Sequence, residues 1–275
     1  MCKVLEVKSN NYYSYQKRKT DKVAHPEHDD VIELIQNIAK FSDYTYGERR
    51  MKAALAALSF PMSRYMVSKL MKEAGVWVRS KKKYKVTTNS NHKQPVFDNL
   101  LKREFDVKQP NQVYVADITY VWTQEGWLYL AVVIDLFSRK VVGWSIGSRM
   151  KAQLVCDALT MAIWQRRPRK GLIVHTDRGS QYASKVYREL LLSNGIKGSM
   201  SRKGDCWDNA VVESFFGSIK QERIQWKSYQ TRYEAQQDIL NYIAMFYNSH
   251  RLHSYLGYES PNNYENKMIK LEKAA

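Results

Sequence analysis

The strongest constraint on the fold is a change of hydrophobic periodicity near residue 112. Before it, apolar residues recur at helical spacing; after it, residues 113–121 alternate, and residues 127–134 form a nearly continuous apolar run. Alternation predicts a strand with one covered face, whereas a continuous apolar run predicts a central strand covered on both faces. The chain therefore divides into a helical part and a part built around a sheet.

The sheet-forming part continues with a strand at 140–146, a helix at 152–166, a strand at 172–175 and a helix at 182–193. A short strand and a last helix follow. Three strands, helix, strand, helix, short strand, helix is the element order of the ribonuclease H-like fold, an α/β fold with a mixed sheet flanked by helices. A fold does not fix a function, which must be argued from particular residues.

The helical part, residues 31–78, follows a polar extension (residues 1–30) and predicts a small helix-turn-helix-like domain. Apolar spacing indicates helices at 31–41 and 48–58, and a third that ends at Gly75, with Met66, Val67, Leu70 and Met71 on its buried face. The last helix of such a module can enter a DNA major groove. A generic helical bundle is the alternative. The candidate DNA contacts here are Arg49, Arg50, Arg64 and Lys69.

Residues 79–111 are predicted to form a basic linker, in which Lys81, Lys82 and Lys83 are candidate phosphate contacts. A polar, charged run supplies no core, and its charges can follow a nucleic-acid backbone. A solvated tether is the alternative, and both interpretations can hold together.

Charge and cysteine content limit the function classes. The 275 residues include 44 Lys and Arg against 27 Asp and Glu, a net charge of +17, which favours a polyanionic partner over a merely soluble basic protein. Three scattered cysteines predict neither a disulfide framework nor a zinc site. No apolar run approaches the ~20 residues that span a bilayer, and no secretory leader is evident, so a cytoplasmic protein is expected.

Three acids carry the chemical argument. Asp117 and Asp177 lie on predicted strands, and Glu213 lies in a predicted helix, with 35 residues between the last two acids. Carboxylates from separate elements offer hard oxygen ligands, which suit two Mg²⁺ ions (or Mn²⁺ as a substitute) acting on a phosphodiester. Taken singly, the acids could be a strand-edge residue, a turn residue and a surface glutamate. Asp135 is a further candidate, but its surroundings favour a turn.

The helix that carries Glu213 has two faces. Asp208 is a candidate N-cap, whereas Asp205 shapes a turn; the predicted buried stripe is Val212, Phe215, Phe216 and Ile219. The neighbouring face holds Asn209, Glu213, Gly217 and Lys220. A glycine inside a helix costs about 1 kcal/mol relative to alanine, so Gly217 indicates close approach, either of a DNA backbone or of another protein segment.

Several segments resemble the DDE transposases of bacterial insertion sequences, with a retroviral-integrase-like core, and most closely the second-frame product of the IS-three group. The resemblance lies in residues 115–120, 175–182, 199–216 and 247–261, and in 46–50 with 67–75 of the helical part. It covers nearly the whole chain. Glu48 and Asp205 depart from residues that are frequent in the family, and the chain has no zinc module of the retroviral type.

The resemblance implies a Mg²⁺-dependent enzyme that cleaves DNA at the terminal inverted repeats of its element and transfers the strand to target DNA. It implies Asp117, Asp177 and Glu213 as metal-binding triad, and Lys220 as a DNA contact; Asn209 and Arg178 are further candidates. It also implies an upstream-frame product or frameshift fusion as partner, a homo-oligomer with DNA, and no membrane.

Two other functions stay open on the sequence: a ribonuclease H-like nuclease without strand transfer, and a non-catalytic DNA-binding derivative. A last hypothesis concerns the C-terminal segment, where His250, Arg251 and His253 are expected to touch DNA near the active cleft. A packed C-terminal turn is the alternative.

Overall fold

The computed structural model describes residues 10, 12–14, 26–79, 96–101, 106–201 and 209–274. They belong to two compact units, Met1–Arg79 and Ser80–Ala275. The predicted DNA contacts Lys81, Lys82 and Lys83, and the acids Asp205 and Asp208, lie outside the described residues. No helix in the described ranges is both long and apolar enough to cross a membrane.

The first unit holds three helices, α2 (Pro26–Phe41), α3 (Glu48–Ala57) and α4 (Arg64–Glu73). The Ser63 hydroxyl caps α4 by accepting a hydrogen bond from the Met66 backbone N–H at 3.2 Å. The core of this unit contains Val31, Ile35, Met51, Leu55, Val67, Leu70 and Met71. Met66, expected in that core, is 43% exposed because the small core covers only a narrow stripe of α4.

The second unit is built on a five-stranded mixed sheet with the order β3-β2-β1-β4-β5. The strands are β1 (Val113–Thr123), β2 (Gly126–Asp135), β3 (Val141–Gly147), β4 (Ile173–Thr176) and β5 (Lys197–Met200). The first three strands pair antiparallel, whereas β1, β4 and β5 pair parallel. The predicted mixed sheet flanked by helices is confirmed.

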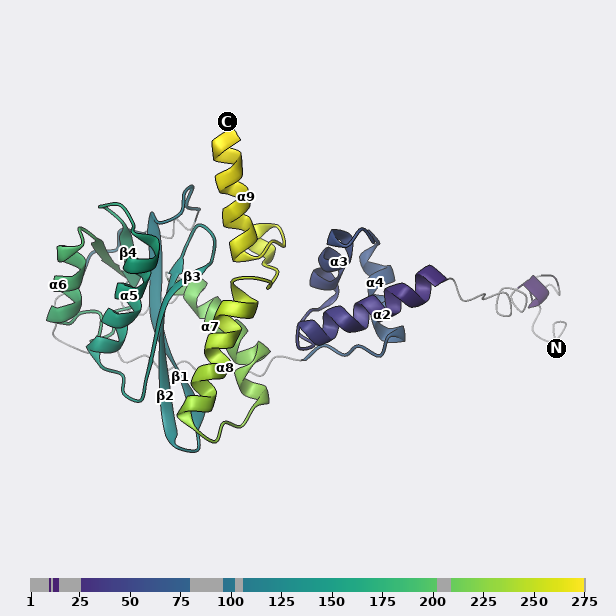
Figure 1. Cartoon of the computed structure of the whole chain (residues 1–275), viewed down its shortest axis with the longest axis horizontal. Coiled ribbons are helices and arrows are strands. Elements are labelled where there is room, and N and C mark those ends of the chain that lie inside the picture. The colour runs from purple at the N-terminus through teal and green to yellow at the C-terminus, as the bar shows by residue number, and fades with distance from the viewer. Residues whose placement is uncertain are drawn as a thin grey trace. The chain divides into compact units, whose positions relative to one another are not determined.

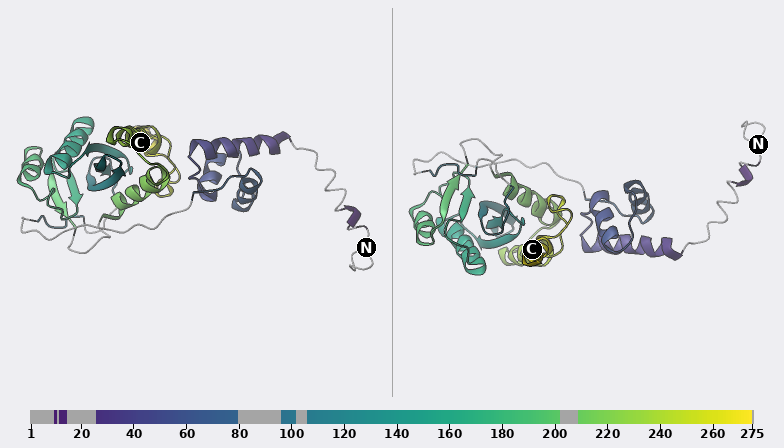
Figure 2. Two further views of the ribbon diagram at one scale, coloured as in Figure 1. Left: turned by 90° about the horizontal axis from the view of Figure 1, so that it is seen from below. Right: turned by 90° about the horizontal axis from the view of Figure 1, so that it is seen from above.

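Helices cover both faces of this sheet (Figures 1 and 2). One face carries α5 (Ala152–Arg166) and α6 (Lys185–Ser193), and the other α7 (Ala210–Glu222) and α8 (Arg232–Asn241). Two hydrophobic cores follow, one on each face, because alternate residues of β1 and β2 point to opposite sides. Helix α6 begins three residues later than expected, since the Ser184 hydroxyl caps it by accepting from the Tyr187 N–H.

Part of the predicted linker packs on the sheet. Leu101 is buried in the core below α7, and the Leu100 N–H donates to the Ser199 hydroxyl at 2.9 Å. The Phe97 ring lies over Gly198 of β5, where an added Cβ would come within 2.8 Å of it. Residues 96–101 therefore belong to the second unit rather than to a free tether.

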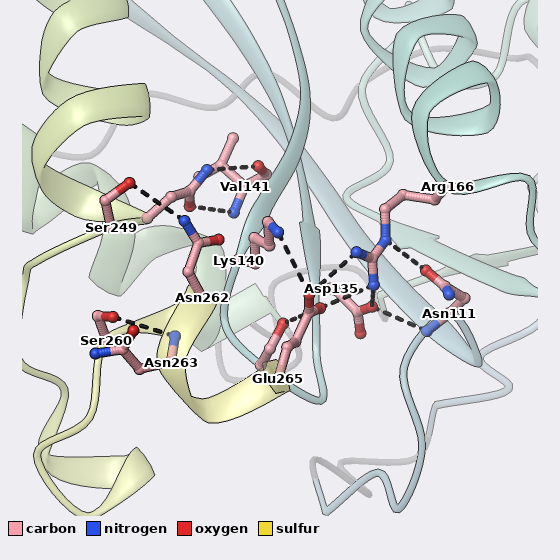
Figure 3. A network of polar contacts seen from close by, with 12 residues as sticks. Asn111, Asp135, Lys140, Val141, Arg166, Ser249, Ser260, Asn262, Asn263 and Glu265 are labelled. Carbon is pink, nitrogen blue, oxygen red and sulfur yellow. Dashed lines mark hydrogen bonds and ion pairs between the residues drawn. The ribbon is translucent and has the colours of Figure 1, made fainter. Parts of the chain in front are cut away.

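A polar network joins the C-terminal helix α9 (Pro261–Ala274) to the sheet, as Figure 3 shows. Glu265 of α9 accepts two hydrogen bonds from the Arg166 guanidinium, at 2.8 and 3.0 Å, and one from Lys140 at 3.3 Å. Arg166 also lies 3.6 Å from Asp135, which accepts backbone N–H bonds from Asn111 and Phe137. Asp135 is thus held in a structural ion network at the end of β2.

Candidate active site

The register of the parallel strands brings the two aspartates together. β1 pairs with β4 through residues that differ by 60 positions, from Val113 opposite Ile173 to Ala116 opposite Thr176. The next position in that register is Asp117 opposite Asp177, since 177 − 117 is also 60. Neighbouring strands lie about 4.8 Å apart. Two aspartates distant in sequence therefore become neighbours where β4 ends.

Asp117 lies on the face of β1 that α7 covers. Val115 and Val121, which share its parity on the strand, pack in the same core as Phe215 and Ile219 of α7. Asp117 itself is half-buried, and one of its oxygens accepts a hydrogen bond from the Ile118 N–H at 2.7 Å. Asp177 accepts from the Gly179 N–H at 2.9 Å. Local backbone donors therefore orient both carboxylates.

Glu213 lies in the first turn of α7, and its side chain is exposed. The predicted buried stripe of this helix is confirmed, because Val212, Phe215, Phe216 and Ile219 are all buried. The residue at the N-cap position is Asn209, rather than Asp208, and its side chain makes no capping hydrogen bond. Helix α7 is therefore anchored by its apolar face and directs Glu213 away from that face.

The charge of Asp117 is unfavourable in this setting. Burial, and then the neighbouring carboxylate of Asp177, raise the pKa of Asp117 well above its ordinary value. Glu213 raises it further, by a smaller effect, while the Ile118 N–H and the Lys220 ammonium lower it. Clustered carboxylates that repel one another in this way gain from a bound cation.

The donor chemistry of the two aspartates fits a hard divalent cation. Among the residues that the structure describes, no three His, Cys, Asp or Glu side chains are grouped to hold a metal ion. Mg²⁺ usually takes one or two protein carboxylates and completes its shell with water and substrate phosphates. The Asp117–Asp177 pair meets that need, and Glu213 faces solvent nearby on α7.

Lys220 lies between this pair and an aromatic side chain. Its ammonium is 5.1 Å from the centre of the Tyr120 ring, within cation–π range. Burial lowers the pKa of Lys220, whereas Tyr120 and Asp117 act in the opposite direction. Lys220 therefore places a half-buried positive charge beside Asp117.

The other predicted DNA contacts differ in accessibility. Arg49 and Lys69 are exposed on α3 and α4, but the exposed Arg64 forms an ion pair with Glu48 at 2.6 Å. Arg50 lies over the Tyr46 ring at 5.7 Å. In the second unit, the half-buried Arg178 donates to the Ser201 carbonyl at 2.7 Å.

Two predicted DNA contacts are buried. Asn209 is 4% exposed, in contrast to the accessible position expected for it. Arg251 is also 4% exposed and pairs with Glu222, so the packed C-terminal turn, the alternative interpretation, is the arrangement observed. His253 contacts Arg251 and the Tyr247 ring, whereas His250 is exposed. The arginine of the C-terminal motif therefore takes part in internal packing.

Gly217 faces open space. A Cβ added there would meet no atom of the described residues within 4 Å, beyond its own helix turn and chain neighbours. The interpretation that Gly217 admits another protein segment therefore finds no support. The half-buried glycine leaves a gap on α7 between Glu213 and Lys220.

Tyr182, the last residue of the 175–182 segment, lies near the two aspartates, a position that the sequence did not predict. Its side chain is 1% exposed, and its hydroxyl has no hydrogen-bond partner among the described residues. Burial raises its pKa well above the ordinary value, and the charges of Asp117 and Asp177 add to the effect. A tyrosine directly after the Asp177 turn was the available signal, but its burial beside the acids depends on tertiary packing.

The chain matches models of the integrase core domain over residues 107–206 and 213–269, and of the HTH-like domain over residues 27–84. It is 42% identical to Transposase InsF for insertion sequence IS3A of Escherichia coli (strain K12), over 98% of this chain and 94% of that protein. It is also 42% identical to the uncharacterized 31 kDa protein of insertion element IS600 of Shigella sonnei, over 97% of this chain and 98% of that protein.

Among solved structures, the chain is similar to the HTLV-2 integrase catalytic core domain in complex with magnesium. That likeness has 20% sequence identity and a TM-score of 0.45, and covers 57% of this chain and 97% of that one. The matches to the family models, and the 42% identity to a relative over 98% of this chain, show which family the chain belongs to. The chain belongs to the IS3 family of transposases, which are enzymes with an integrase core domain.

Proposed function

We propose that this transposase cleaves DNA at the ends of its insertion sequence and joins the freed ends to target DNA, with Asp117, Asp177 and Glu213 as metal-binding residues. The observation that supports this most is the register of β1 and β4, which brings Asp177, the residue after β4, next to Asp117; burial, and then the charge of Asp177, raise the pKa of Asp117. Such a pair is costly without a cation.

The residues of the site have separate roles in this proposal. Asp117 and Asp177 would hold divalent cations, and Glu213 would complete the ligand set from α7. When bound, two Mg²⁺ ions would polarise both the attacking and the leaving oxygen of an in-line displacement. Lys220 would hold a phosphate beside the acids, and no side chain is required as a general base.

The helical unit is proposed to bind DNA through the exposed side of α4, which carries Lys69 and the 80% exposed Tyr65. The proposed DNA partners are the terminal inverted repeats and the target. A homo-oligomer on DNA and an upstream-frame product or fusion are further proposed partners, and the bacterial cytoplasm is the proposed place of action.

The test uses the full chain with Mg²⁺ and DNA that carries the ends of its own element. Wild-type protein should yield cleaved ends and joined products on a sequencing gel. Asp117→Asn, Asp177→Asn and Glu213→Gln should each remove both products. Asp157→Asn, a change at an exposed acid on α5, is the matched control and should leave both products in place.

The two other functions make different predictions in this assay. Cleaved ends without any joined product would show a nuclease that lacks strand transfer. DNA processing that persists in all three acid variants would remove the catalytic assignment. A binding protein without catalysis would shift the DNA in a gel and leave it intact.

A further inference from the structure

Three exposed aromatic side chains form a continuous patch on the β1–β2 hairpin, which we call the aromatic platform: Tyr120, Trp122 and Trp127. They are 37%, 55% and 44% exposed. Trp122 and Trp127 lie directly opposite each other in the strand register, with ring centres 4.8 Å apart. Trp127 also lies 5.0 Å from Tyr120, and both contacts are edge-to-face.

Packing of the fold does not account for this platform. None of the three side chains belongs to either hydrophobic core of the second unit. Cross-strand aromatic pairs stabilise a hairpin, but that role does not require about half of each indole surface to face water. Single exposed aromatics are common, whereas contiguous groups mark binding surfaces.

Lys220 connects the platform to the acids. Tyr120 lies three residues beyond Asp117 on β1, roughly 10 Å along the strand, and its side chain leaves the opposite side of the strand. Lys220 bridges that interval, since its ammonium lies over the Tyr120 ring and lowers the pKa of Asp117. A DNA strand whose phosphate rests on Lys220 would therefore have its next bases beside the platform.

We propose that the aromatic platform binds an unpaired nucleobase of the DNA strand that enters the active site. Every base has a flat π face, and exposed indole rings next to a cation are the usual surface for such a base. Removing a base from the helical stack costs unpairing energy, and stacking on protein rings offsets that cost. This inference rests on the proposed function, because it takes DNA at these acids as the substrate.

The test compares the binding of two probes to the full chain, in buffer with a chelator so that no cleavage occurs. One probe is a blunt duplex of mixed sequence, and the other is the same duplex with a short unpaired end. Wild-type protein should prefer the unpaired end. Trp122→Leu and Trp127→Leu keep apolar bulk but lose the π system, and should weaken binding of the unpaired end by about 5- to 150-fold.

Trp164→Leu is the matched control, since Trp164 is 77% exposed on α5, outside the β1–β2 hairpin that carries the platform. It should leave both affinities unchanged, and the platform variants should bind the blunt probe as wild type does. Trp122→Phe retains a smaller aromatic ring and should recover part of the preference. Iododeoxyuridine placed in the unpaired end should crosslink, on illumination, to the peptide that contains Trp122 and Trp127.

Equal binding of both probes by wild-type protein, or crosslinks that map elsewhere, would overturn the inference. Variants that dissociate an oligomer in sedimentation, yet keep the preference for unpaired ends, would instead assign the platform to an interface between copies. A chain that joins DNA but treats both probes alike would remove this inference only. A chain that prefers unpaired ends but neither cleaves nor joins DNA would remove only the proposed function.

Discussion

Arg251 and Glu222 form a buried, two-pronged ion pair. The Arg251 Nη2 and Nε atoms donate to the two carboxylate oxygens of Glu222 at 2.6 and 2.7 Å, and each side chain is 5% exposed. Glu222 also accepts from the Tyr242 hydroxyl at 2.7 Å, and Arg251 donates to Ser218. This pair fixes the end of α7, the helix that carries Glu213 and Lys220.

Arg251→Met should lower the free energy of unfolding by about 3–5 kcal/mol, because it leaves the Glu222 carboxylate buried without its partner. Urea unfolding followed by circular dichroism measures this. The double variant with Glu222→Gln keeps an acceptor for Tyr242 and should recover most of the loss. A variant that stays as stable as wild type but binds DNA weakly would instead support the DNA contact expected from the sequence.

Asp117→Asn should stabilise the metal-free protein by about 1 kcal/mol, a common size for single stabilising changes. The pKa of Asp117 is raised in the folded state, so the free energy of unfolding of wild type falls as pH rises through that pKa. The difference in stability between Asp117→Asn and wild type should therefore grow as pH rises. Mg²⁺ at about 100 times its Kd should stabilise wild type by roughly 2.7 kcal/mol and the variant by much less. Asp157→Asn should respond to Mg²⁺ as wild type does in the same thermal melts.

Asp135 should make the folding stability fall as pH rises, which is opposite to the effect of an aspartate whose pKa is lowered by folding. Burial raises its pKa from 3.8 to about 6, so the stability that the protonated form contributes is present below about pH 4 and is lost as pH rises through 6. Relative to Asp135→Asn, wild type should lose up to roughly 3 kcal/mol over that window. Urea unfolding of both proteins at a series of pH values tests this; parallel curves would contradict it.

Lys220→Gln should weaken DNA binding across all sequences and reduce the slope of log K against log salt by about 0.9, the effect of one phosphate contact. Lys185→Gln is the control, because the Lys185 side chain is 82% exposed on α6 and pairs with Glu189. Fluorescence anisotropy at several salt concentrations measures both slopes. An unchanged slope in Lys220→Gln would mean that its ammonium contacts no phosphate.

Gly217→Ala separates stability from binding. The added methyl would meet no atom of the described residues outside its own helix turn, so the helix should gain about 1 kcal/mol. If the gap admits a DNA backbone, the affinity for DNA should fall at the same time. Thermal melting and anisotropy on one preparation test both effects, and Gly217→Leu should enlarge the loss of affinity. Greater stability with unchanged DNA binding would leave the glycine without a role in DNA approach.

The sequence by itself determined the elements and the residue types of the site. The alternating and continuous apolar runs marked β1 and β2, because strand periodicity follows directly from which face is buried. Helix α5 was predicted to its ends, and the buried stripe of α7 was identified residue by residue. These are local properties, since they depend on spacing and capping within a few turns of chain.

Tertiary structure alone decided which residues meet. The parallel register between β1 and β4 set Asp117 beside Asp177, and packing turned Arg251 inward to Glu222 rather than outward to DNA. It also drew residues 96–101 onto the sheet and buried Tyr182 beside the acids. The spacing of residues in the sequence does not reveal which partner a charged side chain will have. Burial and ion pairing depend on segments that meet only in the folded chain.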